Sequence, residues 1–272
     1  MGDYRLRLGA SISFTLKNFK ERIEDAKKAG FDTIDLDLCS QWRFPRKEKK
    51  AYETLEDRFI DVKDAEMKIN AVHISFGKYW NISETDEKKR KKIVKKIADI
   101  FNLADKYSPY CYVIHPSIEP IIILDRREKL EATIKSAEEL SCKTKNAICL
   151  ETLPRTCLFN TSEETAKAID QINKDNVKVC IDVNHMLRER SEDAVLALGK
   201  RIATTHISDH DYLDERHYMP GKGKIDWNAL IGALRAIGYQ GVFNYEVGNV
   251  PPAEIKQNYE KLFSAYNESV KE

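Results

Sequence analysis

Apolar and polar side chains alternate along eight short stretches of the 272-residue chain. The stretches are rich in β-branched and aromatic residues, and successive side chains of an extended strand point to opposite faces. We therefore predict eight short strands. Their ranges are 5–12, 33–38, 69–75, 110–117, 147–153, 177–183, 202–208 and 241–247.

Longer stretches with the periodicity of amphipathic helices separate these strands. Residues 16–30 end in Gly30, and residues 226–238 end in a glycine too, which is a common way for a helix to terminate. Residues 90–107 carry an apolar stripe at helical spacing. Residues 161–173 open with a serine or threonine followed three positions later by glutamate, a pattern typical of a helix N-terminus.

This alternation predicts an α/β protein, and eight strand–helix units favour a single (β/α)8 TIM barrel. No linker rich in proline or glycine divides the chain, so we expect one domain over residues 1–272. A doubly wound open sheet is the alternative, because alternation alone does not prove closure. The first predicted strand is not followed by G-x-G-x-x-G, which weakens a dinucleotide-binding version of that alternative.

Strand parity indicates where chemistry would gather. In residues 147–153, Ile148 and Leu150 point to one face, whereas Cys149 and Glu151 point to the other. The same parity puts one polar residue late on the second face of six consecutive strands: His73, His115, Glu151, Asp182, His206 and Glu246. In a barrel this face points inward, and the late positions lie at the end that holds active sites.

A single histidine or glutamate on a strand is usually a hydrogen-bonded structural residue. Six such residues of the same parity are harder to explain in this way. Buried carboxylates are costly without compensation, so their clustering predicts a cation. Two glutamates, an aspartate and a histidine suit a divalent ion such as Mn, Mg, Co or Zn.

The segment 206–227, HISDHDYLDERHYMPGKGKIDW, resembles the H-x-x-D…H…P-G-x-G-x-I-D-W segment of the xylose isomerase-like barrel superfamily. The blocks VIHPS, LETLP, IDVNH and NYEV match other segments of that superfamily in the expected order. The group includes sugar and sugar-phosphate isomerases and epimerases, inosose-processing enzymes and endonuclease IV. Nearly the whole chain takes part in the resemblance.

The resemblance implies one metal ion held by Glu151, Asp182, His206 and Glu246, as in the epimerase branch. It implies that His185 holds substrate. His217 stands where ketose 3-epimerases carry arginine, which puts their particular substrate in doubt.

The endonuclease branch instead implies three zinc ions. Its ligands would fall on His73, His115, Glu151, Asp182, His185, His206, Glu215, His217 and Glu246, with Glu215 in place of an aspartate.

We expect a metal-dependent sugar or sugar-phosphate isomerase or epimerase, and an endonuclease IV-like phosphodiesterase acting on abasic DNA is the alternative. A sugar-binding protein without turnover is a third possibility, which the intact ligand set disfavours. Isomerisation needs a proton removed next to a carbonyl, and Glu151 and Glu246 would serve as acid and base on opposite faces of the substrate.

The predicted substrate-binding residues are His73, His115, His185, His217, Trp42, Trp80 and Lys222. For the two tryptophans, loop packing is at least as good an explanation as stacking on a sugar, and a plain turn explains PGKG around Lys222 equally well.

Charge and composition narrow the choice of partner. The net charge is +1, which gives no general attraction to nucleic acid or anionic membranes. We expect the basic run 88–96 to be the solvated outer face of a helix, and therefore predict no nucleic-acid partner. The sequence lacks a long apolar run, a signal-peptide pattern and any C-x-x-C pair among its six cysteines. We therefore expect a cytoplasmic protein with reduced thiols, no membrane partner, and a homodimer as an open possibility.

Overall fold

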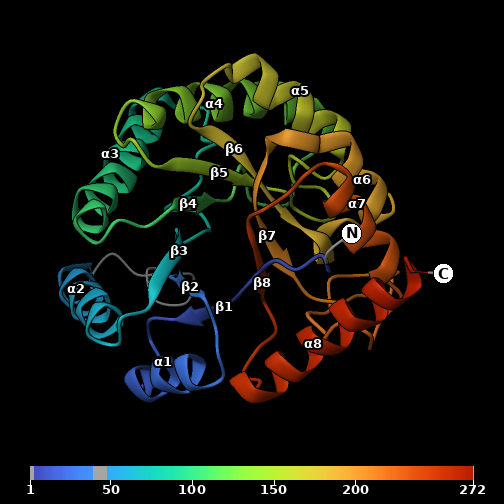
Figure 1. The fold of residues 1–272 in the computed structure, drawn as a ribbon. Coiled ribbons are helices and arrows are strands. Elements are labelled where there is room, and N and C mark those ends of the chain that lie inside the picture. The colour runs from blue at the N-terminus through green and yellow to red at the C-terminus, as the bar shows by residue number, and fades with distance from the viewer. Residues whose placement is uncertain (1–2, 39–47, 272) are drawn as a thin grey trace.

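The computed structural model describes residues 3–38 and 48–271, in which eight parallel strands close into a barrel (Figure 1). Each strand pairs with its neighbour in sequence, and β1 pairs with β8 to complete the circle. The closed barrel confirms the predicted fold and excludes the open sheet. The strands are β1 (Arg7–Ser13), β2 (Thr33–Asp37), β3 (Lys68–His73), β4 (Cys111–Ile114), β5 (Ala147–Glu151), β6 (Val177–Asp182), β7 (Ile202–Ile207) and β8 (Val242–Tyr245).

Helices form an outer ring around the strands (Figure 1). They are α1 (Phe19–Lys28), α2 (Glu48–Asp64), α3 (Glu87–Ala104), α4 (Ile123–Ser141), α5 (Ser162–Ile172), α6 (Ser191–Leu198), α7 (Trp227–Ala236) and α8 (Pro252–Ser269). The Thr161 side chain accepts a hydrogen bond from the Glu164 amide and begins α5, as its sequence pattern predicts. Helix α3 begins three residues earlier than predicted, because Asp86 caps it by accepting from the Lys89 amide.

The two faces of each strand pack into different layers. The large apolar side chains, such as Val72, Ile148 and Leu150, belong to the main core between strands and helices. The barrel interior holds a separate cluster of small side chains. Its members are Ala71, Cys111, Val113, Cys149, Cys180 and Ala203. The parity predicted from the sequence is therefore correct except at the start of β7. There the register with β6 shifts, and Ala203 joins the interior layer although it alternates with Thr204 and His206.

The outer face of α3 departs from expectation at one position. Arg90, within the basic run 88–96, is only 2% exposed. Its guanidinium contacts Glu87 and Glu139, with the Nη2 to Glu139 Oε1 distance at 2.6 Å. The run is therefore not uniformly a solvated face, because this arginine joins α3 to α4.

Two further expectations can be compared with the described residues. The five cysteines among them, Cys111, Cys142, Cys149, Cys157 and Cys180, are free. Within residues 3–38 and 48–271, none of the helices has the length and apolar character needed to cross a membrane.

Candidate active site

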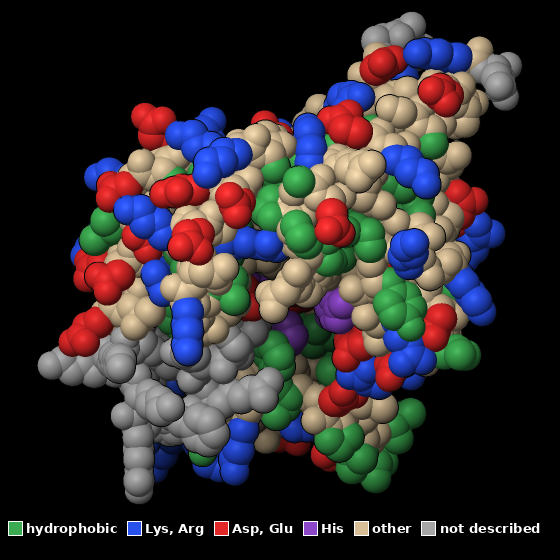
Figure 2. Space-filling model, turned by 90° about the horizontal axis from the view of Figure 1, so that it is seen from below, with side chains coloured by type: hydrophobic (Ala, Val, Ile, Leu, Met, Phe, Trp, Pro, Cys, Tyr) green, Lys and Arg blue, Asp and Glu red, His purple; other side chains and the backbone are tan. Residues whose placement is uncertain are grey.

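A cavity of about 420 Å³ opens at the C-terminal end of the barrel. Histidine side chains are visible in a hollow of the surface in Figure 2. Of the sequence-predicted residues, the cavity wall includes His73, His115, Glu151, His185, His217 and Glu246. The structure therefore brings together side chains from strands and loops that are far apart in the sequence.

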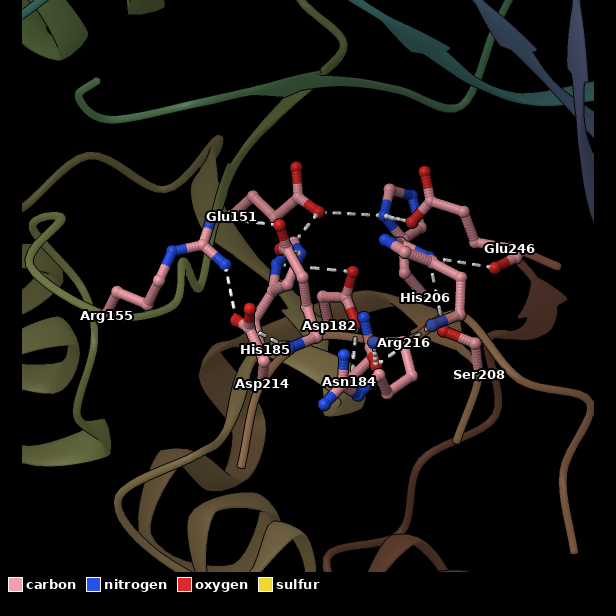
Figure 3. Close-up of polar contacts among 12 residues, drawn as sticks. Glu151, Arg155, Asp182, Asn184, His185, His206, Ser208, Asp214, Arg216 and Glu246 are labelled. Carbon is pink, nitrogen blue, oxygen red and sulfur yellow. Dashed lines mark hydrogen bonds and ion pairs between the residues drawn. The ribbon is translucent and has the colours of Figure 1, made fainter. Parts of the chain in front are cut away.

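Of the four predicted metal ligands, Glu151 and Glu246 line the cavity, whereas Asp182 and His206 do not line it and are fully buried beside them. Glu151 ends β5, Asp182 ends β6, His206 lies on β7, and Glu246 directly follows β8 (Figure 3). One potential ligand atom from each lies within 4.8 Å of the others. His206 Nδ1 is 3.0 Å from Glu151 Oε1 and 3.1 Å from Glu246 Oε2.

Two buried carboxylate oxygens support a cation at this point. Asp182 Oδ2 lies 3.3 Å from a nitrogen of His185, and Glu246 Oε2 lies 3.1 Å from a nitrogen of His206, but neither contact has the geometry of a hydrogen bond. Neither oxygen has a hydrogen-bond partner among the described residues. Buried carboxylate oxygens without partners are unfavourable, and a divalent cation would compensate them. Three carboxylates and one imidazole also match the ligand preferences of Mn, Mg, Co and Zn. The residues therefore fit the metal that the sequence predicts.

Burial and neighbouring charge change the protonation of the cluster. Burial raises the pKa of Asp182 to about 7, although the nearby His185 opposes this. Burial would also raise the pKa of Glu246, but the charge of His206 outweighs it and lowers this pKa. For His206, burial works against the charged ring, whereas the neighbouring Cys180, Glu246 and Glu151 raise its pKa well above the usual value.

Two more histidines contact the same glutamate. The Nε2 atoms of His73 and His115 each lie 3.0 Å from Glu151 Oε2. The His73 ring stacks on that of His206, with 5.4 Å between centroids, and the ring of Phe76 stacks on His115. Burial lowers the pKa of His115, whereas Glu151 overcomes burial and raises the pKa of His73 to about 9.

A second group of ligands lies nearer the rim of the cavity. His185 Nε2 is 3.1 Å from Glu215 Oε2, and its Nδ1 is 2.9 Å from the Thr152 carbonyl oxygen. His217 Nδ1 lies 3.1 Å from the carbonyl oxygen of Glu246. Burial opposes the charged form of His185, but the charge of Asp182 and a hydrogen bond to Glu215 raise its pKa to about 10.

All nine positions of the endonuclease-type set are thus gathered around one cavity. Among the described residues, five overlapping groups of ligand atoms could each hold an ion, and three of these groups together contain all nine positions. Those three groups are His73–His115–Glu151, Glu151–Asp182–His206–Glu246 and His185–Glu215–His217.

Arg155 was not predicted from the sequence, yet it lines the cavity. Its guanidinium contacts Glu119 after β4 at 2.6 Å, and Asp214 and Glu215 after β7 at 2.6 and 2.9 Å (Figure 3). It therefore joins three loops and fixes the carboxylate that faces His185. Arg155 follows β5, so strand parity could not reveal it.

Asp37 also lines the cavity and was not predicted. It ends β2 and shares its parity with Asp35, which lies inside the barrel at 0% exposure. Applying the parity argument to residues 33–38 would have identified both aspartates.

Three predicted substrate-binding residues are not placed at the cavity. Trp80 is 2% exposed and does not line it, and the Lys96 ammonium lies 3.9 Å from the centre of its ring. Lys222 is exposed outside the cavity wall, and the amides of Gly221 and Gly223 donate to Asp209 Oδ2. A carboxylate of the protein thus receives the amide donors of the PGKG segment. Trp42 lies outside the described residues.

Comparison with known proteins agrees with this geometry. A family model described as "Xylose isomerase-like TIM barrel" matches residues 23–265. The chain belongs to this family. The match spans most of the barrel, including every residue assigned above to the cavity.

Relatives with assigned activities include several sugar epimerases and an inosose isomerase of Bacillus subtilis, which is 32% identical and matches 34% of this chain and 36% of the relative. The chain is 28% identical to L-ribulose 3-epimerase of Methylomonas sp., covering 84% of this chain and 77% of the relative. It is 23% identical to 3-dehydro-D-guloside 4-epimerase of Escherichia coli, covering 91% of this chain and 93% of that relative. An uncharacterized protein of Methanocaldococcus jannaschii is 25% identical, with 97% of this chain and 91% of that protein covered.

Solved structures share the same fold. A D-tagatose 3-epimerase-like protein superposes with a TM-score of 0.77 at 24% identity, covering 97% of this chain and 100% of that chain. The D-psicose 3-epimerase of Clostridium cellulolyticum H10 gives a TM-score of 0.73 at 19% identity, with 98% and 97% covered. At these identities the likeness shows the barrel.

Proposed function

We propose that the protein is a divalent-metal-dependent isomerase or epimerase of sugars or sugar phosphates. The observation that carries this proposal is the position of Glu151 and Glu246, whose carboxylates both approach His206 Nδ1 from different strands. Membership of the xylose isomerase-like family and relatives that are sugar epimerases support the same reaction class.

One divalent ion, Mn, Mg, Co or Zn, would be held by Glu151, Asp182, His206 and Glu246. When bound, such an ion polarises a carbonyl and an adjacent hydroxyl of the substrate, which acidifies the neighbouring C–H bond. The buried oxygens of Asp182 and Glu246 that lack a hydrogen bond among the described residues support this ligand set.

Glu151 and Glu246 would transfer the proton. Burial opposes ionisation of both, but nearby histidines lower both pKa values, so both side chains are carboxylates near neutral pH. One carboxylate takes the proton from carbon, and the other, once protonated, returns one to the opposite face. Glu246 is 24% exposed and Glu151 only 1%, so Glu246 exchanges protons with water more readily.

The histidines around the carboxylates would orient the substrate. His185 and His217 lie at the rim and face the cavity, where they can hydrogen-bond sugar hydroxyls. His73 and His115 would hold further hydroxyls or water against Glu151. Nε2 of His73 contacts Glu151 and Nε2 of His185 contacts Glu215, so each charged ring would bind a hydroxyl oxygen by exchanging its carboxylate partner for substrate.

One observation favours a second candidate, an endonuclease IV-like phosphodiesterase. The nine positions of the three-zinc set are gathered into three groups. The charge distribution argues against it, since the rim loop after β7 carries Asp211, Asp214 and Glu215 beside Arg216. Phosphate backbones are held by clusters of lysine and arginine, and this loop offers no such cluster.

The test is solvent deuterium exchange into a panel of ketoses and ketose phosphates, using protein loaded with Mn²⁺. We expect exchange at carbon next to the carbonyl, and a loss of about 10²–10⁴-fold in Glu246→Gln with metal occupancy measured alongside. The same protein loaded with zinc is incubated with duplex DNA carrying one abasic site, and we expect no cleavage. Efficient cleavage that disappears in His115→Ala would replace the isomerase proposal with the nuclease.

A further inference from the structure

A buried carboxylate lies beneath the proposed metal site. Asp35, in the middle of β2, is 0% exposed and points into the barrel. Its Oδ2 lies 3.4 Å from Nε2 of His206. Neither atom has a hydrogen-bond partner among the described residues, although both are buried. Each of the two atoms therefore has the other as a polar neighbour within reach of a hydrogen bond.

The other oxygen of this carboxylate is already fixed. Asp35 Oδ1 accepts hydrogen bonds from Asn70 Nδ2 at 2.7 Å and from the Ala71 amide at 3.1 Å. Asn70 in turn donates to Thr204 Oγ1 at 3.0 Å. These contacts hold the carboxylate so that Oδ2 is the oxygen presented to His206.

The His206 ring thus lies between two different environments. Nδ1 faces Glu151 and Glu246, where a metal ligand atom is required, and Nε2 faces Asp35. An imidazole that binds a metal through one nitrogen carries its proton on the other, and a carboxylate acceptor fixes that tautomer.

We propose that Asp35 is a positioning residue that keeps the proton of His206 on Nε2 and so leaves Nδ1 free to bind the metal. The inference rests on the metal site proposed above. Asp35 does not contact the cavity and acts only through the ring.

The substitution Asp35→Asn tests the proposal, because two hydrogen-bond donors fix which side-chain atom can occupy the Oδ1 position. In Asp35→Asn the oxygen must stay at Oδ1, because Asn70 and Ala71 both donate to it. The amide NH2 then takes the place of Oδ2 and donates to Nε2. This arrangement forces the proton of a neutral ring onto Nδ1, the atom needed by the metal.

The experiment measures the Zn²⁺ affinity of purified wild-type, Asp35→Asn, Asp35→Ala and Thr204→Val proteins by competition with a chromogenic chelator. Thr204→Val is the matched control, since it removes a hydrogen bond from the same buried layer without touching Oδ2. We expect affinity to fall by about 10–100-fold in Asp35→Asn. The Zn²⁺ affinity of Asp35→Ala should fall less than that of Asp35→Asn. The affinity of Thr204→Val should stay within about threefold of wild type, because Asp35 still contacts His206 Nε2 in that variant.

A role in packing alone predicts the opposite order, since asparagine preserves the volume of aspartate and alanine does not. The proposal would be overturned if Asp35→Ala bound Zn²⁺ more weakly than Asp35→Asn, or if all four proteins bound it equally.

If wild type binds no zinc, the proposed function fails instead. In that case proton NMR still tests Asp35. With ¹⁵N-labelled protein, an imidazole N–H resonance assigned to Nε2 and missing in His206→Gln should be present in wild type. In Asp35→Asn the ring proton should be found on Nδ1 instead, and retention of the Nε2–H resonance would refute the contact.

Discussion

The deep and rim groups of ligands differ in how the chain holds them. The deep group is Glu151, Asp182, His206 and Glu246, and three of its members belong to strands. The rim group is His185, Glu215 and His217, which lie in segments that follow β6 and β7. Asp182 and His206 are 0% exposed, whereas Glu215 is 29% exposed.

This difference separates two tasks. Side chains on strands are fixed by the ladder of the barrel and by the packed layer beneath them, so they suit a metal whose ligands must hold their geometry. Side chains on loops depend on a few polar contacts, here Asn184 and Arg155. Asn184 Oδ1 accepts from the amides of Arg216 and His217 at 2.9 and 3.3 Å. Loops of this kind can change between relatives without disturbing the barrel, which suits substrate selection.

The largest expected effect compares metal binding by the two groups. Glu151→Ala should lower Mn²⁺ affinity by at least about 100-fold, because it removes a ligand and leaves the other buried charges uncompensated. Glu215→Ala should leave one bound ion per chain with nearly unchanged affinity. Equilibrium dialysis with elemental analysis measures both stoichiometry and affinity. Three ions in wild type, with loss of one in Glu215→Ala, would show that the rim group is a metal site as well.

The same contrast explains what could be predicted from the sequence. His73, Glu151, Asp182 and His206 alternate with large apolar residues on their strands, and that pattern alone places them inside the barrel. Their convergence then follows from closure. Arg155 and Asn184 have no such signal, since a loop residue has no periodicity to relate it to its partners. The contact between Trp80 and Lys96 has no such signal either, because a loop position does not show which side chain it meets.

Asp35 and Asp37 show a different limit. The parity of β2 contains both, because Asp35 and Asp37 alternate with Ile34 and Leu36. Which of the two lines the cavity and which lies beneath it depends on how deep each residue sits in the barrel. That depth comes from the register of β2 with β3, which pairs Asp37 with His73.

A medium effect should appear in the pH dependence of the deep group. Ligands must be deprotonated to bind a metal. Burial raises the pKa of Asp182 to about 7, and neighbouring Cys180, Glu246 and Glu151 overcome burial to raise that of His206. Both groups therefore hold protons as pH falls below neutrality, and both protons must leave on binding. Glu151 and Glu246 have lowered pKa values and release none in this range.

Mn²⁺ affinity should consequently rise with pH between about 6 and 7, by roughly tenfold per pH unit for each proton released. Isothermal titration in buffers of different ionisation enthalpy counts those protons directly. The apparent enthalpy should change with the buffer in wild type. An enthalpy independent of the buffer, together with pH-independent affinity, would contradict the protonation assigned to Asp182 and His206.

The smallest expected effect concerns Arg155 and the rim. Arg155 is 35% exposed, so its ion pairs with Glu119, Asp214 and Glu215 are partly screened, each worth about 0.2–1 kcal/mol. In Arg155→Gln the loop after β7 loses these contacts, and Glu215 is held less firmly against His185. Because the proposed metal ligands are untouched, we expect KM for the sugar to rise by about fivefold while kcat and metal affinity change little.

Steady-state kinetics of Arg155→Gln are compared with those of Arg127→Gln as the control. Arg127 is exposed on α4 and pairs only with Glu131 among the described residues. Raising the salt concentration should weaken wild-type binding toward the Arg155→Gln value. A fall in kcat with unchanged KM would instead place Arg155 in the deep group's chemistry, and the division of tasks between strands and loops would then be wrong.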